Sequence, residues 1–355
     1  MLKARHIGLL ILLVCVSGVS ATFWLAGHVH RPLLLQERQL LEVAPGSSLS
    51  ALIRQLERDG LLGGRTEAAR RRVGVRLYDL FTDVSQRVRV GEYEVKPGDT
   101  LLQLLLRVER GDVLQRQVTL LEGWNMREVR AALARAEKLR QVVADISDQE
   151  LMERLGRPDK SPEGWFAPDT WSYTSADSDL DVLRRALLRQ ETLLADAWKN
   201  RAENLPYSDA YDALIMASII EKETGVPSER GEIAGVFVER LRRGMRLQTD
   251  PTVIYGMGDR YEGRIRRADL REATPWNTYV IRGLPPTPIA MPGADAIRAA
   301  VAPQPTDALF FVARGDGSHQ FSRTLEEHNR AVREYQLNRR QDYRSSPAPA
   351  SEPEQ

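Results

Sequence analysis

The sequence contains one cysteine among 355 residues, Cys15, and it lies inside an apolar stretch near the N-terminus. An internal disulfide is therefore impossible, and hydrophobic cores alone must hold the folded parts together. Histidine is also scarce, with five residues in the whole chain. None of them has the spacing of a zinc site, so the sequence predicts neither a metal ion nor a cofactor.

An excess of charge of either sign is missing too. The chain carries 50 Lys and Arg against 49 Asp and Glu, a net charge of +1 at pH 7. Such a balance gives no basic field to attract a polyanion, so nucleic acid is not an expected partner. The sequence also has no GxSxG, no Walker loop and no GxGxxG, which argues against serine hydrolases, P-loop enzymes and dinucleotide-binding enzymes.

A long uncharged run is present near the N-terminus, from Ile7 to Ala26. A helix of this length spans roughly 30 Å, the thickness of the hydrocarbon core of a bilayer. Lys3 and Arg5 precede the run, which favours a cytoplasmic N-terminus, and Trp24 lies near its far end. We expect residues 1–31 to form a cytoplasmic N-terminus and a retained transmembrane anchor. A cleavable signal peptide, cut after Val19-Ser20-Ala21, is the alternative.

A weak internal repeat follows. Val43–Leu49 and Val95–Leu101 share a valine, a Pro-Gly pair and a leucine, 52 residues apart. Each copy predicts a strand, a turn, and a helix capped by Ser48 or Thr100. The copies resemble the opening of LysM modules, which bind N-acetylglucosamine-containing glycans; a small spacer without glycan affinity is the alternative. We assign residues 38–115 to this LysM-like α+β subdomain.

The rest of the chain divides into a second α+β domain, residues 116–340, and a tail, residues 341–355. The tail is rich in Ser, Pro, Ala and Glu and is predicted to be disordered. Within the domain, apolar periodicity predicts helices over residues 126–139, 148–155 and 183–201, with a polar connection over residues 177–181. A turn at residues 315–317 is expected to join two short strands.

Residues 217–225, ASIIEKETG, are the most informative stretch. They end a helix that Ser208 is expected to cap, and this helix is apolar almost all round, so it should be buried. Glu221 falls on the face of Ser218 in the last turn, whereas Glu223 points nearly opposite. A carboxyl there either reaches solvent at the helix end or lies in a partly dry cleft, where burial raises its pKa and lets it donate a proton. The residues alone leave both interpretations open.

Two further stretches carry polar groups suited to sugar hydroxyls. The first, MRLQTDPTVIYG, contains Gln248, Asp250 and Tyr255. The second, WNTY, contains Asn277 and precedes the proline-rich segment GLPPTPI. A rigid loop beside aromatic and amide side chains is typical of a cleft wall, although each stretch alone is also typical of a structural turn.

Taken together and in this order, ASIIEKET, ERLRRGMRLQTDPTVIYG, NTYVIRGLPPTPI and MPGADAI closely resemble the MltG family, also called YceG-like proteins. EGWNMREV, EGWFAPDTW and the terminal FFVARGDGSHQFSRTLEEHN also fit, and the resemblance covers residues 41–337. The sequence departs from the family pattern at Ala167, Thr287 and Met291.

The resemblance implies an endolytic lytic transglycosylase that cuts between N-acetylmuramic acid and N-acetylglucosamine in nascent peptidoglycan strands and leaves 1,6-anhydro ends. It implies Glu221 as the catalytic acid and base, with substrate-binding roles for the nearby polar residues, namely Ser218, Glu223, Gln248, Asp250, Tyr255 and Asn277. It also implies a single-pass protein of the bacterial inner membrane, with its catalytic domain in the periplasm and cell-wall synthases (penicillin-binding proteins) as partners.

Two other functions remain open at this stage. A muramidase would hydrolyse the same bond with water, and Asp250 would then be its second carboxylate. A glycan-binding scaffold for cell-wall synthases would need no catalysis at all.

Overall fold

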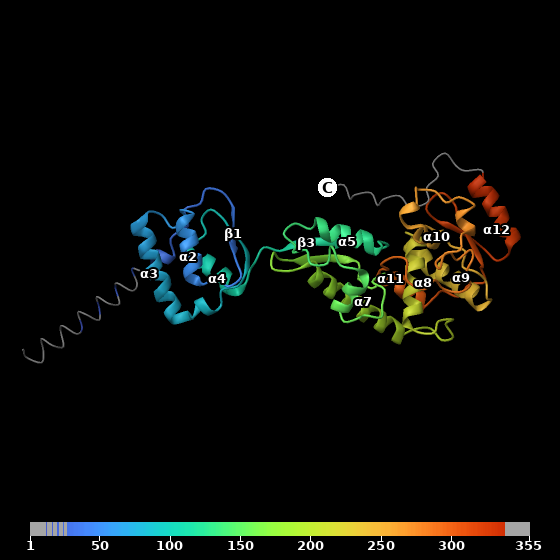
Figure 1. Ribbon diagram of the computed structural model, residues 1–355, viewed down its shortest axis with the longest axis horizontal. Coiled ribbons are helices and arrows are strands. Elements are labelled where there is room, and N and C mark those ends of the chain that lie inside the picture. The colour runs from blue at the N-terminus through green and yellow to red at the C-terminus, as the bar shows by residue number, and fades with distance from the viewer. Residues whose placement is uncertain (1–11, 13–15, 17–19, 21–23, 25–26, 338–355) are drawn as a thin grey trace, which may run out of the picture. The chain divides into compact units, whose positions relative to one another are not determined.

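The computed structural model describes residues 27–337 and, before them, Leu12, Val16, Ser20 and Trp24 (Figure 1). Most of the expected anchor and all of the expected tail lie outside these residues. Among the described residues, no helix is both long enough and apolar enough to cross a membrane. The chain divides into two compact units, and the first comprises the chain up to Arg116 with Glu137–Arg140 and Ser172–Asp177.

The first unit is built around the internal repeat. Its elements in chain order are β1 (Gln39–Val43), α2 (Leu49–Arg58), α3 (Arg65–Thr82), η1 (Val84–Gln86), β2 (Gly91–Val95) and α4 (Leu101–Arg110). Strands β1 and β2 pair antiparallel, with Gln39 opposite Val95 and Val43 opposite Gly91. The predicted strand, turn and helix of both copies are confirmed. The Ser48 hydroxyl accepts from the Ala51 N–H, and Thr100 forms a capping box with Gln103.

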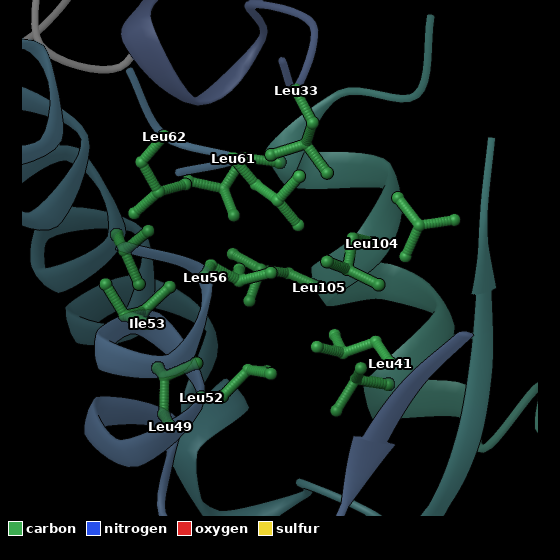
Figure 2. Packing of buried hydrophobic residues seen from close by; sticks show 14 of the residues in the cluster. Leu33, Leu41, Leu49, Leu52, Ile53, Leu56, Leu61, Leu62, Leu104 and Leu105 are labelled. Carbon is green, nitrogen blue, oxygen red and sulfur yellow. The ribbon is translucent and has the colours of Figure 1, made fainter. Parts of the chain in front are cut away.

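Leucine side chains fill the core of this unit. Figure 2 shows those of α2 and α4 facing each other across it, with Leu56 and Leu105 near the middle. Leu56, Leu104 and Leu105 have no exposed surface. Burial of one such side chain stabilises a fold by about 1.5–3 kcal/mol, so the repeated leucines hold this unit together without a disulfide.

The remaining elements in chain order are β3 (Arg116–Leu120), α5 (Met126–Arg135), α6 (Asp148–Arg154), β4 (Asp169–Tyr173), α7 (Asp179–Lys199), α8 (Ala210–Glu223), η2 (Pro227–Glu229), α9 (Arg230–Arg242), α10 (Asp250–Met257), η3 (Gly258–Arg260), η4 (Asp269–Arg271), α11 (Ala294–Val301), β5 (Phe310–Ala313), β6 (His319–Ser322), α12 (Leu325–Val332) and η5 (Arg333–Leu337). Strands β3 and β4 pair, and β5 and β6 form the expected antiparallel hairpin.

Helix α8 is the centre of the second unit (Figure 1). Every residue from Ala213 to Ile220 is buried, as its apolar sequence predicts, and α7, α9, α10 and α11 pack around it. The predicted cap was wrong by one residue. The Asp209 carboxylate, not Ser208, accepts from the N–H groups of Tyr211 and Asp212, because a carboxylate is a stronger acceptor at the positive end of a helix.

Two other boundaries differ from the sequence prediction. Helix α7 begins inside the expected polar connection, because Ser178 and Asp181 form a capping box. Asp179 is buried there and accepts from the N–H groups of Val142 and Val143. Helix α5 ends at Arg135, four residues before the expected end.

Candidate active site

A cavity of about 1040 Å³ lies at the C-terminal end of α8. Several segments far apart in the sequence form its walls: residues 122–123 before α5, 221–225 at the end of α8, Arg230 and Arg240 of α9, 247–251 at the start of α10, Tyr279, and 310–313 of β5. The cavity is large enough for an extended polar ligand. Four of the residues that the sequence singled out line this cavity, namely Glu221, Glu223, Gln248 and Asp250.

Glu221 occupies a nearly dry position on this wall, with its side chain only 6% exposed. Its Oε2 accepts a hydrogen bond of 2.9 Å from the Gly293 N–H, and its Oε1 lies 3.5 Å from Nη2 of Arg230. Burial raises the pKa of Glu221, the Gly293 N–H opposes that rise, and the neighbouring Glu122 carboxylate adds to it. The side chain is thus suited to hold a proton at a higher pH than an ordinary glutamate.

Gly293 explains how a carboxylate is tolerated at the C-terminal end of α8, where the helix dipole disfavours it. Gly293 is the N-cap of α11, so its N–H lies at the positive end of a second helix. A Cβ at this position would overlap the carboxylate of Glu122. The absence of a side chain therefore lets the two acidic groups approach the same backbone segment.

Arg230 is the basic group of this cluster and was not singled out from the sequence. Its side chain is 12% exposed, and its guanidinium lies 3.5 Å from Glu221, 3.8 Å from Glu122 and 3.3 Å from Asp295. One positive charge among three carboxyls can stabilise the ionised form of Glu221 once its proton has been given away. No sequence signal identifies it, because arginines are common throughout the chain.

Glu223 lines the same cavity, although helical geometry predicted that it points away from Glu221. The two statements are compatible, because Glu223 is the last residue of α8 and the cavity is large. Its carboxylate accepts from the Thr249 hydroxyl. Burial raises the pKa of Glu223 to about 7, and the charge of Asp250 adds to the rise. A second protonatable carboxyl is thus present in the cavity.

The segment around the start of α10 supplies further polar groups of the cavity. Asp250 accepts a hydrogen bond of 2.7 Å from the Tyr279 hydroxyl. Gln248 has a left-handed backbone, with φ +51°, and its N–H donates to the carbonyl of Thr278 at 3.2 Å. Such a conformation is uncommon for a residue with a side chain and costs of the order of 1 kcal/mol. Tertiary contacts hold it beside the cavity.

Three of the expected site residues do not line the cavity. Ser218 is fully buried, where its hydroxyl donates to the Ile215 carbonyl and accepts from the Ile289 N–H. Asn277 is 1% exposed, and its amide donates to the carbonyls of Asp269 and Glu272. The hydroxyl of Tyr255 donates to Glu163. These contacts hold loops and helices in place, and they give no support to the prediction of direct substrate contact.

Glu163 is a further buried acid that the sequence analysis did not select. It accepts from the N–H of Met126, the first residue of α5, at 3.1 Å, and from Tyr255 of α10 at 3.0 Å. Burial raises the pKa of Glu163 to about 7. Glu163 therefore connects the start of α5 to α10. The cavity residues Glu122 and Gly123 lie just before α5. The EGWF segment that contains it was the available signal.

A carboxyl with little exposed surface on the wall of a large polar cavity, on a helix packed among others, fits one class of protein: an acid/base enzyme for an extended polar substrate. The chain belongs to the YceG-like family, whose sequence model matches residues 41–334. The predicted family is therefore confirmed. In the part of the chain that the structure describes, no group of three His, Cys, Asp or Glu residues is placed to hold a metal ion.

Individual relatives agree with this family. The chain is 32% identical over 314 residues to the endolytic murein transglycosylase of Bacillus subtilis (strain 168), covering 83% of this chain and 84% of the relative. It is 32% identical over 181 residues to the protein of that name from Streptococcus pneumoniae (strain ATCC BAA-255 / R6), covering 49% of this chain and 32% of the relative. A crystal structure of a putative YceG-like protein from Listeria monocytogenes matches with a TM-score of 0.53 and 28% identity, covering 83% of this chain and 99% of that one.

Proposed function

We propose that this protein is an endolytic murein transglycosylase that cuts peptidoglycan strands with Glu221 as its acid and base. The setting of Glu221 carries the proposal, since its carboxyl lines the large cavity and burial raises its pKa. The Bacillus subtilis relative with that name spans most of this chain.

In the first step, Glu221 donates its proton to the glycosidic oxygen between N-acetylmuramic acid and N-acetylglucosamine. The C1–O bond breaks, and positive charge develops on the muramic acid ring. The ionised Glu221 is then stabilised by the Gly293 N–H and by Arg230.

In the second step, the Glu221 carboxylate takes the proton of the muramic acid C6 hydroxyl. The C6 oxygen attacks C1 and closes a 1,6-anhydro ring, so the catalytic carboxyl returns to its protonated state. One residue serves both steps in turn, because no water has to be activated. Gln248, Glu223 and Asp250 line the cavity and would bind sugar hydroxyls or amides.

Hydrolysis by a muramidase is the second candidate, and a specific observation favours it. Asp250 and Glu223 provide further carboxyls in the cavity of Glu221, and one of them could activate a water molecule. The two reactions differ in their products by one water molecule, since hydrolysis leaves a reducing end and cyclisation leaves an anhydro end.

The test is digestion of purified peptidoglycan followed by mass analysis of the products. The full-length protein should release fragments with anhydro ends, and Glu221→Gln should lose this activity by about 10²–10⁴-fold, the usual contribution of general acid catalysis. Glu262→Gln, at a side chain that is 73% exposed, is the matched control and should keep full activity. Reducing ends alone would favour the muramidase, and full activity of a folded Glu221→Gln protein would exclude Glu221 as the catalytic acid. No cutting by the wild-type protein would favour a non-enzymatic scaffold.

The placement of the protein in the cell is part of the same proposal. The uncharged run from Ile7 to Ala26 supports a retained single-pass anchor in the bacterial inner membrane, with the chain after Arg31 in the periplasm. The two strand-turn-helix copies support a LysM-like, glycan-contacting role for the first unit. Penicillin-binding proteins, which make the strands, are the proposed partners. N-terminal sequencing decides whether the anchor is retained, because a mature protein that starts at Thr22 has no anchor.

A further inference from the structure

Helix α3 of the first unit has two apolar faces, and only one of them is covered. Ala68 and Val75 are buried in the core. On another side of the helix, Val73, Leu80 and Phe81 are 41%, 74% and 78% exposed. With about 100° per residue, these three and the partly buried Leu77 fall within one arc of about 100°. We call these four residues the α3 apolar face.

Such a face is unusual on a protein surrounded by water. Single exposed apolar side chains are common, but a row of them along a helix, ending in an exposed leucine and phenylalanine, marks a surface that binds something apolar. The fold does not need Leu80 or Phe81, since most of each side chain makes no contact within the unit. The face therefore fits an external occupant.

The charges of α3 fit an anionic occupant at the border of that face. The helix has five arginines and two acidic residues. Of the two acids, Glu67 is engaged by His28 at 2.9 Å and by Arg31 and Arg71, and Asp79 accepts from the Ser85 N–H at 2.7 Å. Arg65, Arg72 and Arg76 are exposed and lie along one side of the face on a helical projection. Arg72 also pairs with Glu57 at 3.6 Å. An apolar face with a basic border is the pattern of a helix that lies in a membrane surface.

The position of α3 in the chain points to the same occupant. The guanidinium of Arg70 lies 5.1 Å from the ring centroid of Trp24, and Arg71 donates to the Pro32 carbonyl at 2.9 Å. On the helical projection Arg70 falls between Leu77 and Phe81, three residues before Val73, so Trp24 lies at the N-terminal end of the α3 apolar face. Trp24, itself 54% exposed, belongs to the end of the uncharged run. These contacts join α3 to the segment that would leave the bilayer.

We propose that α3 lies in the outer surface of the membrane that holds the anchor. Its apolar face contacts the boundary of headgroups and acyl chains, and Arg72 and Arg76 contact the phosphates of anionic lipids. The proposal rests on the anchor described under the proposed function, but it does not depend on the chemistry of Glu221. This contact would hold the first unit against the bilayer, whereas the anchor alone would leave the unit free to move away from it.

The experiment places a fluorescent label on the α3 apolar face of the full-length protein in lipid nanodiscs that contain phosphatidylglycerol. Cys15 is the only native cysteine, so Cys15→Ser gives a background for single labels. Labels at Phe81→Cys and, separately, at Val73→Cys report on the face. Leu188→Cys on α7, at a leucine that is 55% exposed, is the matched control in the second unit. Brominated lipid quenches labels inside the bilayer, and iodide quenches labels in water.

Both labels on α3 should be quenched by brominated lipid and should lose most of their quenching by iodide, whereas the label at position 188 should behave in the opposite way. Adding Arg72→Glu and Arg76→Glu should reduce the lipid quenching at position 81. Iodide quenching equal to that of the control would overturn the proposal. Protection from iodide without lipid quenching would do the same, because it means that protein covers the face. A chain that does not associate with the nanodiscs overturns the anchor and this proposal together, but leaves the cutting assay unaffected.

Discussion

At the scale of single residues, the proton of Glu221 is controlled by groups that only the folded chain brings near it. Glu122 lies 99 residues earlier in the sequence, and its negative charge raises the pKa of Glu221. A general acid works while it is protonated, so activity is lost as the pH rises through the pKa of Glu221. The alkaline side of the pH profile therefore reports on this interaction.

We predict that Glu122→Gln shifts the alkaline side of the pH–activity profile to lower pH. Removal of a like charge favours the ionised form of Glu221, so the acid is lost earlier as the pH rises. Initial rates of anhydro-fragment release between pH 4 and pH 9 measure the shift. Glu262→Gln serves as the control and should keep the wild-type profile. An unchanged or upward-shifted profile would show that Glu122 does not act on Glu221.

At the scale of elements, a buried carboxyl connects α5 and α10. Glu163 receives hydrogen bonds from Met126 and Tyr255, and its pKa is raised to about 7. In the unfolded chain its pKa is the ordinary 4.5. Between about pH 4.5 and 7 the folded state therefore holds this proton and the unfolded state does not. The contribution of Glu163 to the free energy of unfolding falls as the pH rises through this window and is constant above it.

We predict that Glu163→Gln reduces this loss of stability, because an amide does not ionise. At 1.36 kcal/mol per pKa unit, the difference in pH dependence is on the order of 3 kcal/mol between pH 4.5 and pH 8. Thermal unfolding midpoints at several pH values measure it. Some dependence should remain, since the pKa of Glu223 is raised to about 7 as well. A variant with the full wild-type slope would contradict the role of Glu163.

Two glycines of α9 give a second prediction at this scale. Replacing glycine by alanine in a helix normally stabilises it by roughly 0.5–1 kcal/mol. At Gly235, however, a Cβ would overlap the backbone oxygen of Gln304, which cannot move aside easily. At Gly231 the nearest atom to a Cβ would be the Gln304 Cβ, at 3.3 Å.

We therefore expect Gly235→Ala to destabilise the protein by about 1–3 kcal/mol, the usual cost of overpacking. Gly231→Ala should change the stability little, and it is the matched control in the same helix against the same residue. Chemical denaturation with a helix-sensitive signal measures both. Equal stability of the two variants would mean that the approach of residue 304 to α9 is not tight.

At the scale of the whole molecule, each unit has its own core. Leu56 has no exposed surface in the first unit, and the residues of the cavity all belong to the second. We predict that Leu56→Ala lowers the free energy of unfolding of the first unit by about 2–5 kcal/mol. The products released from soluble glycan should keep their anhydro ends. Calorimetry and product analysis test the two parts, and a loss of all cutting while the second unit is folded would show that cutting requires an intact first unit.

The sequence by itself determined the family, the α+β composition, the two copies of strand, turn and helix, and the burial of α8. These follow from local periodicity, turn residues and contiguous motifs, which act over a few residues. It also singled out Glu221, whose assignment as the catalytic residue remains a prediction.

Only the tertiary structure decided which side chains meet in the cavity. Gly293, Arg230 and Glu122 surround Glu221 from three other segments, and Glu223 lines the same cavity. Ser218 and Asn277 are near in sequence to cavity residues, but their side chains form hydrogen bonds with backbone groups instead. The physical reason is that the dryness and charge around a carboxyl depend on distant segments, and no local pattern in the sequence records their approach.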